Sequence, residues 1–410
     1  MDISFLDGVP QIRLDVFFIL GIACLCYFLG RWIKSKITLL QDLCIPVPFI
    51  GGFPAALAFS LLKVFGVANV ILNPELNSLI FRFFLTMIAL FASRVLIKKG
   101  ILISVLFWAL AMVLASIQAI VGIVLCEAMD IHQHLGLLVG TVSMIGGYDT
   151  ISNFIPIINL LDKASGATEN AMGLVTLGMV SSMLVGAPLG VYLIKRYDLK
   201  NPNRTEFDNN RLIRSIQRSD KPFYQTHTVE CLKIVAIAFV CMALGDWFNQ
   251  TFIKETPLPD YVSCMIFALL IRNIADATEW FSVDGLALRT LTKLFLILFI
   301  LVSTCALQLD LILTLSAPVV FIYLICLLIN ILFARFVYFT CLGKNFRAML
   351  ITVGGMGFSM GVAGNGLSNM QSLCEKYGPN TDGFLVLSIV GLVLLNISNA
   401  FLLHFLLGSL

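Results

Sequence analysis

Long apolar stretches alternate with short polar segments along the whole of this 410-residue chain. Most of the stretches are about 17 to 25 residues long, the length that a helix needs to cross the hydrocarbon core of a bilayer. Backbone groups at that depth must be hydrogen-bonded internally, so each stretch is expected to be helical. The pattern predicts ten spanning helices, at Asp15–Trp32, Pro46–Val67, Leu79–Ile97, Ile101–Glu127, Ala171–Ile194, Val229–Trp247, Leu258–Ile274, Leu291–Leu309, Ile312–Phe339 and Gly383–Leu407.

Two further apolar segments, Leu135–Ile158 and Ala348–Leu367, are rich in glycine. Each glycine weakens a helix interior by about 1 kcal/mol relative to alanine, so an uninterrupted helix is a poor description of either segment. A break at membrane depth leaves peptide groups without partners, unless a ligand, an ion, water or neighbouring protein satisfies them. We therefore predict a re-entrant or broken-helix segment at each place.

The two halves of the chain resemble each other at a separation of about 210 residues. Phe84–Ala92 resembles Leu296–Thr304, and the paired glycines Gly146 and Gly147 match Gly354 and Gly355. Pro-x-Pro pairs that precede apolar runs match at nearly the same offset. A nearly constant offset over several weak matches indicates an internal duplication.

A polar linker at residues 195–227 divides the expected spans five and five. Because five is odd, the second half must be upside down relative to the first. The sequence thus predicts an all-α membrane protein with two inverted repeats of five transmembrane helices, residues 1–194 and 228–410, each containing one Gly-rich re-entrant segment.

The composition agrees with a membrane protein and excludes several other classes. Hydrophobic residues make up 59% of the chain and charged residues only 12%, whereas soluble domains carry about 25% charged residues. A net charge of +3 offers no basic surplus for binding nucleic acid. The eleven cysteines form no CxxC pair, so neither a zinc site nor a disulfide framework is expected, and no cofactor is predicted apart from sodium as a coupling ion.

Basic residues predict the orientation in the membrane. The linker alone contains eight Lys and Arg, and most other basic residues fall on the same side when the spans are followed in order. The positive-inside rule then puts the linker in the cytoplasm and both termini outside. Residues 1–15 lack the basic start of a signal peptide, so we expect a multi-pass protein of the cell (inner) membrane, in contact with lipid, whose first helix is not cleaved.

Candidate binding residues gather in the two Gly-rich segments, where half-helix N-termini bind anions and unwound carbonyls bind sodium in transporters. Close helix packing through small residues is the alternative reading of each segment. The paired positions favour a site for substrate and ion. The candidates are Ser143, Gly146, Gly147, Tyr148, Asp149, Thr150, Asn153, Gly354, Gly355, Gly357, Ser359, Asn365, Asn369 and Asn399.

Asp149 is the candidate with the clearest chemistry, because an ionisable side chain at membrane depth is costly and is functional by default. Coordination of a sodium ion, proton coupling and pairing with a cationic group of the substrate are all open to its carboxylate. The alternative is a solvated loop residue, or an ion pair with Arg82 or Arg94.

Three stretches resemble the glutamate:sodium symporter family, and the likeness runs through nearly the whole chain. They are Ile45–Gly52, Leu137–Thr150 and Gly354–Pro379, of which the last, with its N-M-Q…E-K-Y-G-P run, is the most distinctive. The resemblance implies two inverted five-helix domains, each with a Gly-rich re-entrant loop, in a homodimer. It also implies uptake of glutamate or a related small anionic solute or amino acid together with sodium.

The chain departs from the usual pattern of that family at Tyr148 and Asp149, where a histidine and a small residue are usual, and at Gly355. A proton-coupled transporter of a different small organic solute is therefore an alternative, and a passive channel is another. Tyr148-Asp149 also resembles an element of intramembrane aspartyl proteases. Such an enzyme needs a second carboxylate, and the matching segment Gly354–Phe358 contains none, so no enzyme is expected.

Overall fold

The computed structural model describes residues 2–6, 9–91, 94–145, 147, 150–151, 154, 167–202, 223–252, 261–279, 283–387 and 394–409. Its elements in chain order are β1 (Asp2–Leu6), β2 (Val9–Leu14), α1 (Val16–Lys36), α2 (Thr38–Asp42), α3 (Val47–Val64), β3 (Asn69–Leu72), α4 (Pro74–Phe91), α5 (Arg94–Ala128), α6 (Gln133–Leu137), the π-turn η1 (Leu138–Val142), α8 (Ala167–Tyr197), α10 (Phe223–Phe252), α11 (Tyr261–Thr278), α12 (Gly285–Cys305), α13 (Asp310–Leu313), α14 (Ala317–Phe333), η3 (Ala334–Tyr338), α15 (Phe339–Cys341), α16 (Phe346–Phe358), α17 (Ala363–Tyr377), α18 (Thr381–Val386) and α19 (Asn396–Ser409).

Within these residues, eight helices are long and apolar enough to cross a membrane, and each matches one of the ten expected spans. The other two expectations are met only in part. Leu79–Ile97 overlaps α4 and the start of α5, and Gly383–Leu407 overlaps α18 and α19, with residues 92–93 and 388–393 outside the described part of the chain. Large apolar side chains point outward from the spans, as they do at Phe17 and Phe28 of α1, which are 87% and 64% exposed. Such a surface suits lipid better than water.

The helices pack as two groups, to which both halves of the chain contribute. One group, called here the α12 group, comprises α1, α3, α4, α10, α11 and α12. The other, the hairpin group, comprises α5, α6, η1, α8, α13, α14, η3 and the helices from α15 to α19. The main contacts between the groups are those of α12 with α17 and of α3 with α13.

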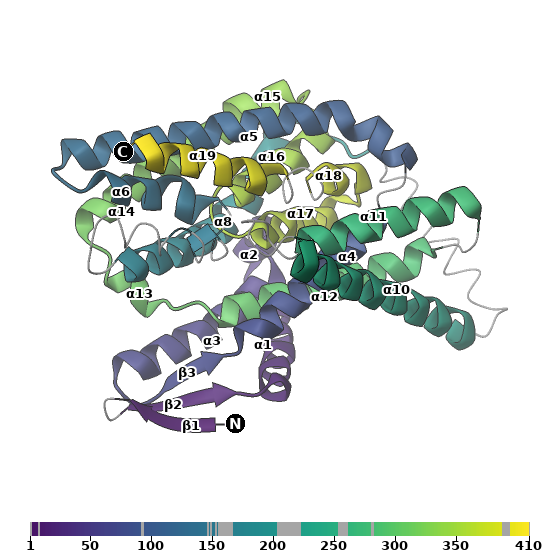
Figure 1. Cartoon of the computed structure of the whole chain (residues 1–410), viewed down its shortest axis with the longest axis horizontal. Coiled ribbons are helices and arrows are strands. Elements are labelled where there is room, and N and C mark those ends of the chain that lie inside the picture. The colour runs from purple at the N-terminus through teal and green to yellow at the C-terminus, as the bar shows by residue number, and fades with distance from the viewer. Residues whose placement is uncertain are drawn as a thin grey trace.

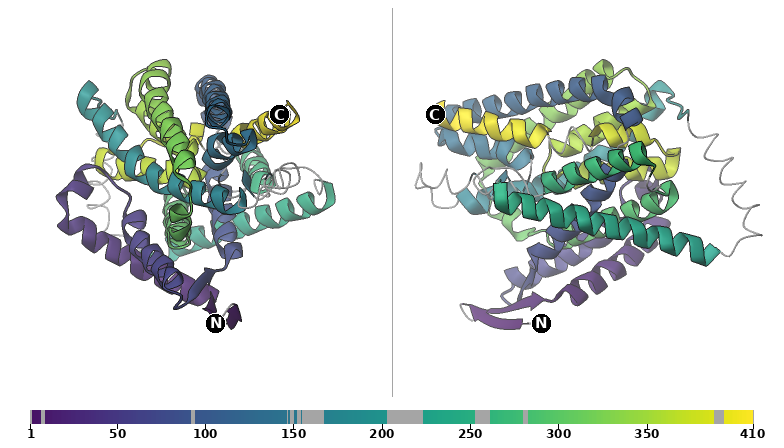
Figure 2. Two further views of the ribbon diagram at one scale, coloured as in Figure 1. Left: turned by 90° about the vertical axis from the view of Figure 1, so that its left-hand side faces the viewer. Right: turned by 45° about the vertical axis from the view of Figure 1, so that its right-hand side comes forward.

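The two groups can be followed in the figures. Figure 1 shows α1 and α3 at one edge of the molecule and α5, α16 and α19 at the opposite edge. In both figures α5 and α19 run side by side (Figures 1 and 2), and the indole Nε1 of Trp108 on α5 donates to Ser398 Oγ on α19 at 3.0 Å.

A small sheet at the N-terminus was not expected. Strand β1 pairs antiparallel with β2, with Leu6 opposite Val9, and β2 pairs parallel with β3. Asp7-Gly8 between two alternating runs is the sequence signature of a two-residue hairpin. The all-α prediction overlooked that signal because the neighbouring apolar stretch dominates the pattern.

The second Gly-rich segment forms a helical hairpin from α16 and α17. The N-cap residue Asn345 begins α16, because its Oδ1 accepts a hydrogen bond from the N–H of Ala348 at 2.8 Å. The helices run antiparallel and touch backbone to backbone, because a Cβ at Gly366 would lie 2.3 Å from the carbonyl oxygen of Gly354. Four residues, 359–362, turn the chain between the helices, and Gly361 has a φ of +129°.

Candidate functional site

The ends of the two Gly-rich segments meet inside the hairpin group. The N–H of Gly361 donates to the carbonyl oxygen of Met144 at 2.7 Å, and Ile145 and Gly361 form an isolated parallel bridge. Gly147 has a φ of +61°, and a Cβ there would lie 2.8 Å from Cγ2 of Val362. We call Met144, Ile145 and Gly147 together with residues 359–362 the tip contact.

Side chains on the first segment hold its end in place. The chain passes from α6 through the π-turn η1, and Ser143 Oγ donates to the carbonyl oxygen of Val139 at 3.2 Å. The carbonyl oxygen of Ile145 accepts from Thr150 Oγ1 at 3.0 Å and from Asn399 Nδ2 of α19 at 3.4 Å. Thus Ser143, Thr150 and Asn399, all predicted site residues, bond to this segment.

On the second segment, the carbonyl oxygen of Ser359 lies just beyond the C-terminus of α16. It accepts from Asn330 Nδ2 of α14 at 2.7 Å and from Gln118 Nε2 of α5 at 3.4 Å. The Ser359 hydroxyl donates back to the carbonyl oxygen of Gly355 at 3.1 Å. Two carboxamides from two different spans therefore converge on one carbonyl oxygen.

Two other predicted residues attach α17 to α8. Asn365 Nδ2 donates to the carbonyl oxygen of Met179 at 3.4 Å, and Asn369 Nδ2 donates to that of Ser182 at 2.9 Å. Both asparagines are buried. They fix the position of α17, and hence of the tip contact, relative to a long helix of the first half.

The remaining predicted site residues are glycines that pack against other parts of the chain or residues outside the described part. Gly354 and Gly357 form the close packing between α16 and α17. The glycines that the repeat pairs have different surroundings: Gly355 faces the aromatic rings of Phe107 and Tyr338, whereas Gly147 lies against Gly361 and Val362. Four predicted residues lie outside the described residues: Gly146, Tyr148, Asp149 and Asn153.

Several buried polar atoms of the hairpin group have no hydrogen-bond partner among the described residues. They are Gln118 Oε1, Thr141 Oγ1, Asn330 Oδ1, Asn369 Oδ1 and Asn399 Oδ1. A buried acceptor without a partner costs about 1–3 kcal/mol. An array of such oxygens around interrupted helices can bind a cation, which would supply the missing interaction.

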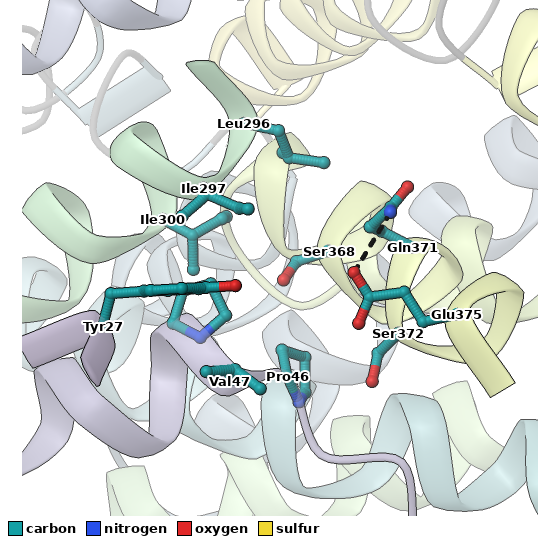
Figure 3. Close-up of a pocket in the computed structure, with 11 residues that line it drawn as sticks. Tyr27, Pro46, Val47, Leu296, Ile297, Ile300, Ser368, Gln371, Ser372 and Glu375 are labelled. Atoms are coloured by element: carbon teal, nitrogen blue, oxygen red, sulfur yellow. Dashed lines mark hydrogen bonds between the residues drawn. The ribbon is translucent and has the colours of Figure 1, made fainter. Parts of the chain in front are cut away.

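A cleft lies between α12 and α17, away from the tip contact (Figure 3). Tyr27, Pro46 and Val47 line one side, and Gln371 Nε2 donates to Glu375 Oε1 at 3.3 Å on the other. Leu296, Ile297 and Ile300 of α12 complete the apolar part of the lining. Most of these residues are apolar, which fits a passage or a contact between the two groups better than an anion site.

Two ion pairs join the α12 group to the hairpin group. Lys293 Nζ of α12 lies 2.7 Å from Glu375 Oε1 of α17, beside the cleft. On α3, Lys63 Nζ lies 2.6 Å from Asp310 Oδ2 of α13. Next to the first pair, Ser372 Oγ donates to the carbonyl oxygen of Cys44. Burial raises the pKa of the Cys44 thiol. The thiol of Cys44 therefore stays protonated at neutral pH and acts as a packing group.

Reasoning from the sequence did not select Gln118 or Asn330. Each is a lone carboxamide within a long apolar span and is 0% exposed. A polar side chain in such a stretch is a usable signal, because its burial in a bilayer must be compensated. What the sequence cannot supply is the contact that brings α5 and α14 to the same carbonyl oxygen.

Comparison with known proteins identifies the family of this chain. The model of the sodium/glutamate symporter family matches residues 12–379 of the chain. The chain is 28% identical over 389 residues to a sodium/glutamate symporter of Haemophilus influenzae, covering 94% of this chain and 95% of that protein. It is 26% identical over 389 residues to a sodium/glutamate symporter of Escherichia coli, covering 95% and 96%. This chain belongs to the sodium/glutamate symporter family, a family of multi-pass membrane transporters and not of enzymes.

Proposed function

We propose that this protein uses the inward movement of sodium to take up glutamate, by alternating access around the tip contact. The observation that carries the proposal is the pair of helix ends at residues 359–362. The C-terminus of α16 carries a partial negative charge that favours a cation, and the N-terminus of α17 carries a partial positive charge that favours an anion. A sodium ion and a carboxylate can therefore bind side by side there.

The N-terminus of α17 supports an anionic substrate. Its N-cap, Val362, has no side chain that accepts a hydrogen bond from the first turn. The ring of Phe299 on α12 lies over Gly364, where an added Cβ would be 2.0 Å from Cε1 of the ring. Movement of the α12 group relative to α17 would uncover this helix end, as alternating access requires.

The packing of the helices supports inverted repeats as part of the proposal. The α12 group takes three helices from each half of the chain, and the hairpin group takes the rest of both halves. With five spans in each half, the two Gly-rich segments would enter the membrane from opposite sides. Both termini would then be outside and residues 195–227 in the cytoplasm. A homodimer completes the proposal, and the mass of the purified protein in detergent tests it.

Two alternatives keep a transport function. A proton-coupled carrier of another organic solute would share the architecture but would not need sodium at residues 359–362. A passive channel requires a continuous aqueous path, whereas the tip contact is buried at Met144, Ile145 and Ser359. The buried contact favours a carrier.

Uptake into proteoliposomes tests the proposed function. The purified protein should accumulate labelled glutamate when sodium is imposed outside, and should not do so under an imposed proton gradient in choline. Aspartate and a neutral amino acid serve as competitors, since an anion site should prefer the acidic ones. Accumulation that follows the proton gradient alone would replace sodium by proton coupling.

Asp149 is proposed to take part in ion coupling. Replacing it with asparagine keeps the size and one oxygen but removes the charge, so the sodium concentration for half-maximal uptake should rise by on the order of tenfold or more. If Asp149 carries a proton instead, Asp149→Asn should abolish the pH dependence of uptake while exchange of substrate persists. Unchanged sodium and pH dependence would show that Asp149 is a solvated or ion-paired loop residue.

A further inference from the structure

The carbonyl oxygen of Ser359 has a chemically unusual environment. It lies at the negative end of α16, and two carboxamide NH2 groups, from Gln118 and Asn330, donate to it. Both side chains are 0% exposed, and the oxygen of each carboxamide has no partner among the described residues. Each amide thus presents its donor to the carbonyl while its own acceptor goes unused.

We infer that Ser359, Gln118 and Asn330 form a sodium site, in which the terminal amide groups of Gln118 and Asn330 rotate when the ion binds. Rotation of each terminal amide by half a turn exchanges NH2 for oxygen with little change in the space occupied. Three oxygens, those of Gln118, Asn330 and the Ser359 backbone, then face one point at the end of α16. In the sodium-free state the NH2 groups take the place of the cation. This inference rests on the proposed sodium coupling and assigns it to particular atoms.

The arrangement suits sodium in charge as well as in ligand type. A hard cation binds carbonyl and amide oxygens, and unwound helix C-termini coordinate sodium in transporters. The three named ligands are neutral, so the bound ion keeps its positive charge. The N-terminus of α17 begins four residues after Ser359 and can hold a substrate carboxylate nearby. Sodium and an acidic substrate would then stabilise each other's binding, which is the basis of coupling.

The competing interpretation is that the two carboxamides only satisfy the last carbonyls of α16. In that case the donors matter and the oxygens do not. Substitution by the corresponding acid separates the two ideas, because Asn330→Asp and Gln118→Glu retain an oxygen and lose the donor. Asn330→Leu removes both.

The test is the thermal unfolding of the purified, glutamate-free protein in detergent, with sodium chloride titrated against choline chloride at slightly alkaline pH. The wild-type protein should be stabilised by sodium in a saturable way. Asn330→Leu should raise the sodium concentration for half-maximal stabilisation by on the order of tenfold or more, whereas Asn330→Asp and Gln118→Glu should lower it, because each adds a negative charge to a ligating oxygen. Asn273→Leu on α11 is the matched control, because Asn273 also donates to a carbonyl oxygen and has an unpartnered Oδ1, and this variant should respond like the wild type.

Each outcome decides one of the two ideas. If the acid variants lose stability equally in sodium and choline while the sodium response stays at the wild-type midpoint, the carboxamides are helix caps and the sodium site is elsewhere. The same conclusion follows if Asn330→Leu keeps the wild-type sodium midpoint. If Asn330→Leu does not fold, the acid variants decide alone. A wild-type protein that shows no sodium response contradicts the proposed sodium coupling itself.

Discussion

Replacing Gly147 with valine is expected to reduce sodium-driven uptake at least about tenfold while the protein still inserts in the membrane. The φ of +61° at Gly147 is strained for any residue with a Cβ, by about 1–3 kcal/mol. The new side chain would also meet Val362, whose Cγ2 lies 2.8 Å from the expected Cβ position. Both effects separate the two ends that form the tip contact. Initial uptake by proteoliposomes, normalised to the amount of reconstituted protein, measures the loss.

Gly66→Val is the matched control for the backbone effect. Gly66 follows α3 and has a φ of +68°, but nothing lies within 4 Å of a Cβ placed there. The control carries the same strain without the steric contact, so it should retain most of the uptake. If the Gly66 and Gly147 variants lose uptake equally, backbone strain alone explains the result and the tip contact has no special role.

Replacing Gly366 with valine is expected to prevent α16 and α17 from packing. The Cβ would lie 2.3 Å from the carbonyl oxygen of Gly354, a backbone atom that cannot move without displacing its helix. Overpacking of this kind costs about 1–3 kcal/mol or more. We expect Gly366→Val to have both a lower unfolding temperature in detergent and a loss of uptake. Gly147→Val should also lose uptake, but with a smaller change in the unfolding temperature.

Gly383→Ala provides the comparison for that variant. Gly383 lies in α18 of the same helix group, but the atom nearest to an added Cβ is Leu350 Cβ at 3.4 Å, an ordinary contact. Its stability and uptake should match the wild type. A normal unfolding temperature for Gly366→Val would mean that the hairpin does not depend on this close approach.

Much of the fold follows from local features of the sequence. Apolar stretches of spanning length predict α1, α3, α5, α8 and α10 to within a few residues at most ends, because burial in lipid forces internal hydrogen bonding. The glycines of the second segment also predict its interruption, and the structure breaks it after Phe358. These are consequences of composition within one segment.

The features that the sequence does not predict depend on contacts between distant segments. The repeat offset pairs Gly147 with Gly355, yet Gly147 lies against Val362, because the ends of the segments meet rather than their paired glycines. Likewise, Gln118 and Asn330 are isolated in their own spans and become neighbours only through the Ser359 carbonyl. Apolar periodicity carries no information about such pairs.

Binding of labelled glutamate to the detergent-solubilised protein tests most directly whether the tip contact is the transport site. It is measured in sodium and in choline for the wild type, for Gly147→Val at the tip contact and for Glu375→Gln in the cleft of Figure 3. We expect the wild type and Glu375→Gln to bind glutamate in sodium only, and Gly147→Val to bind it in neither salt. Wild-type binding by Gly147→Val together with loss of binding in Glu375→Gln would place the site in the cleft and contradict the account.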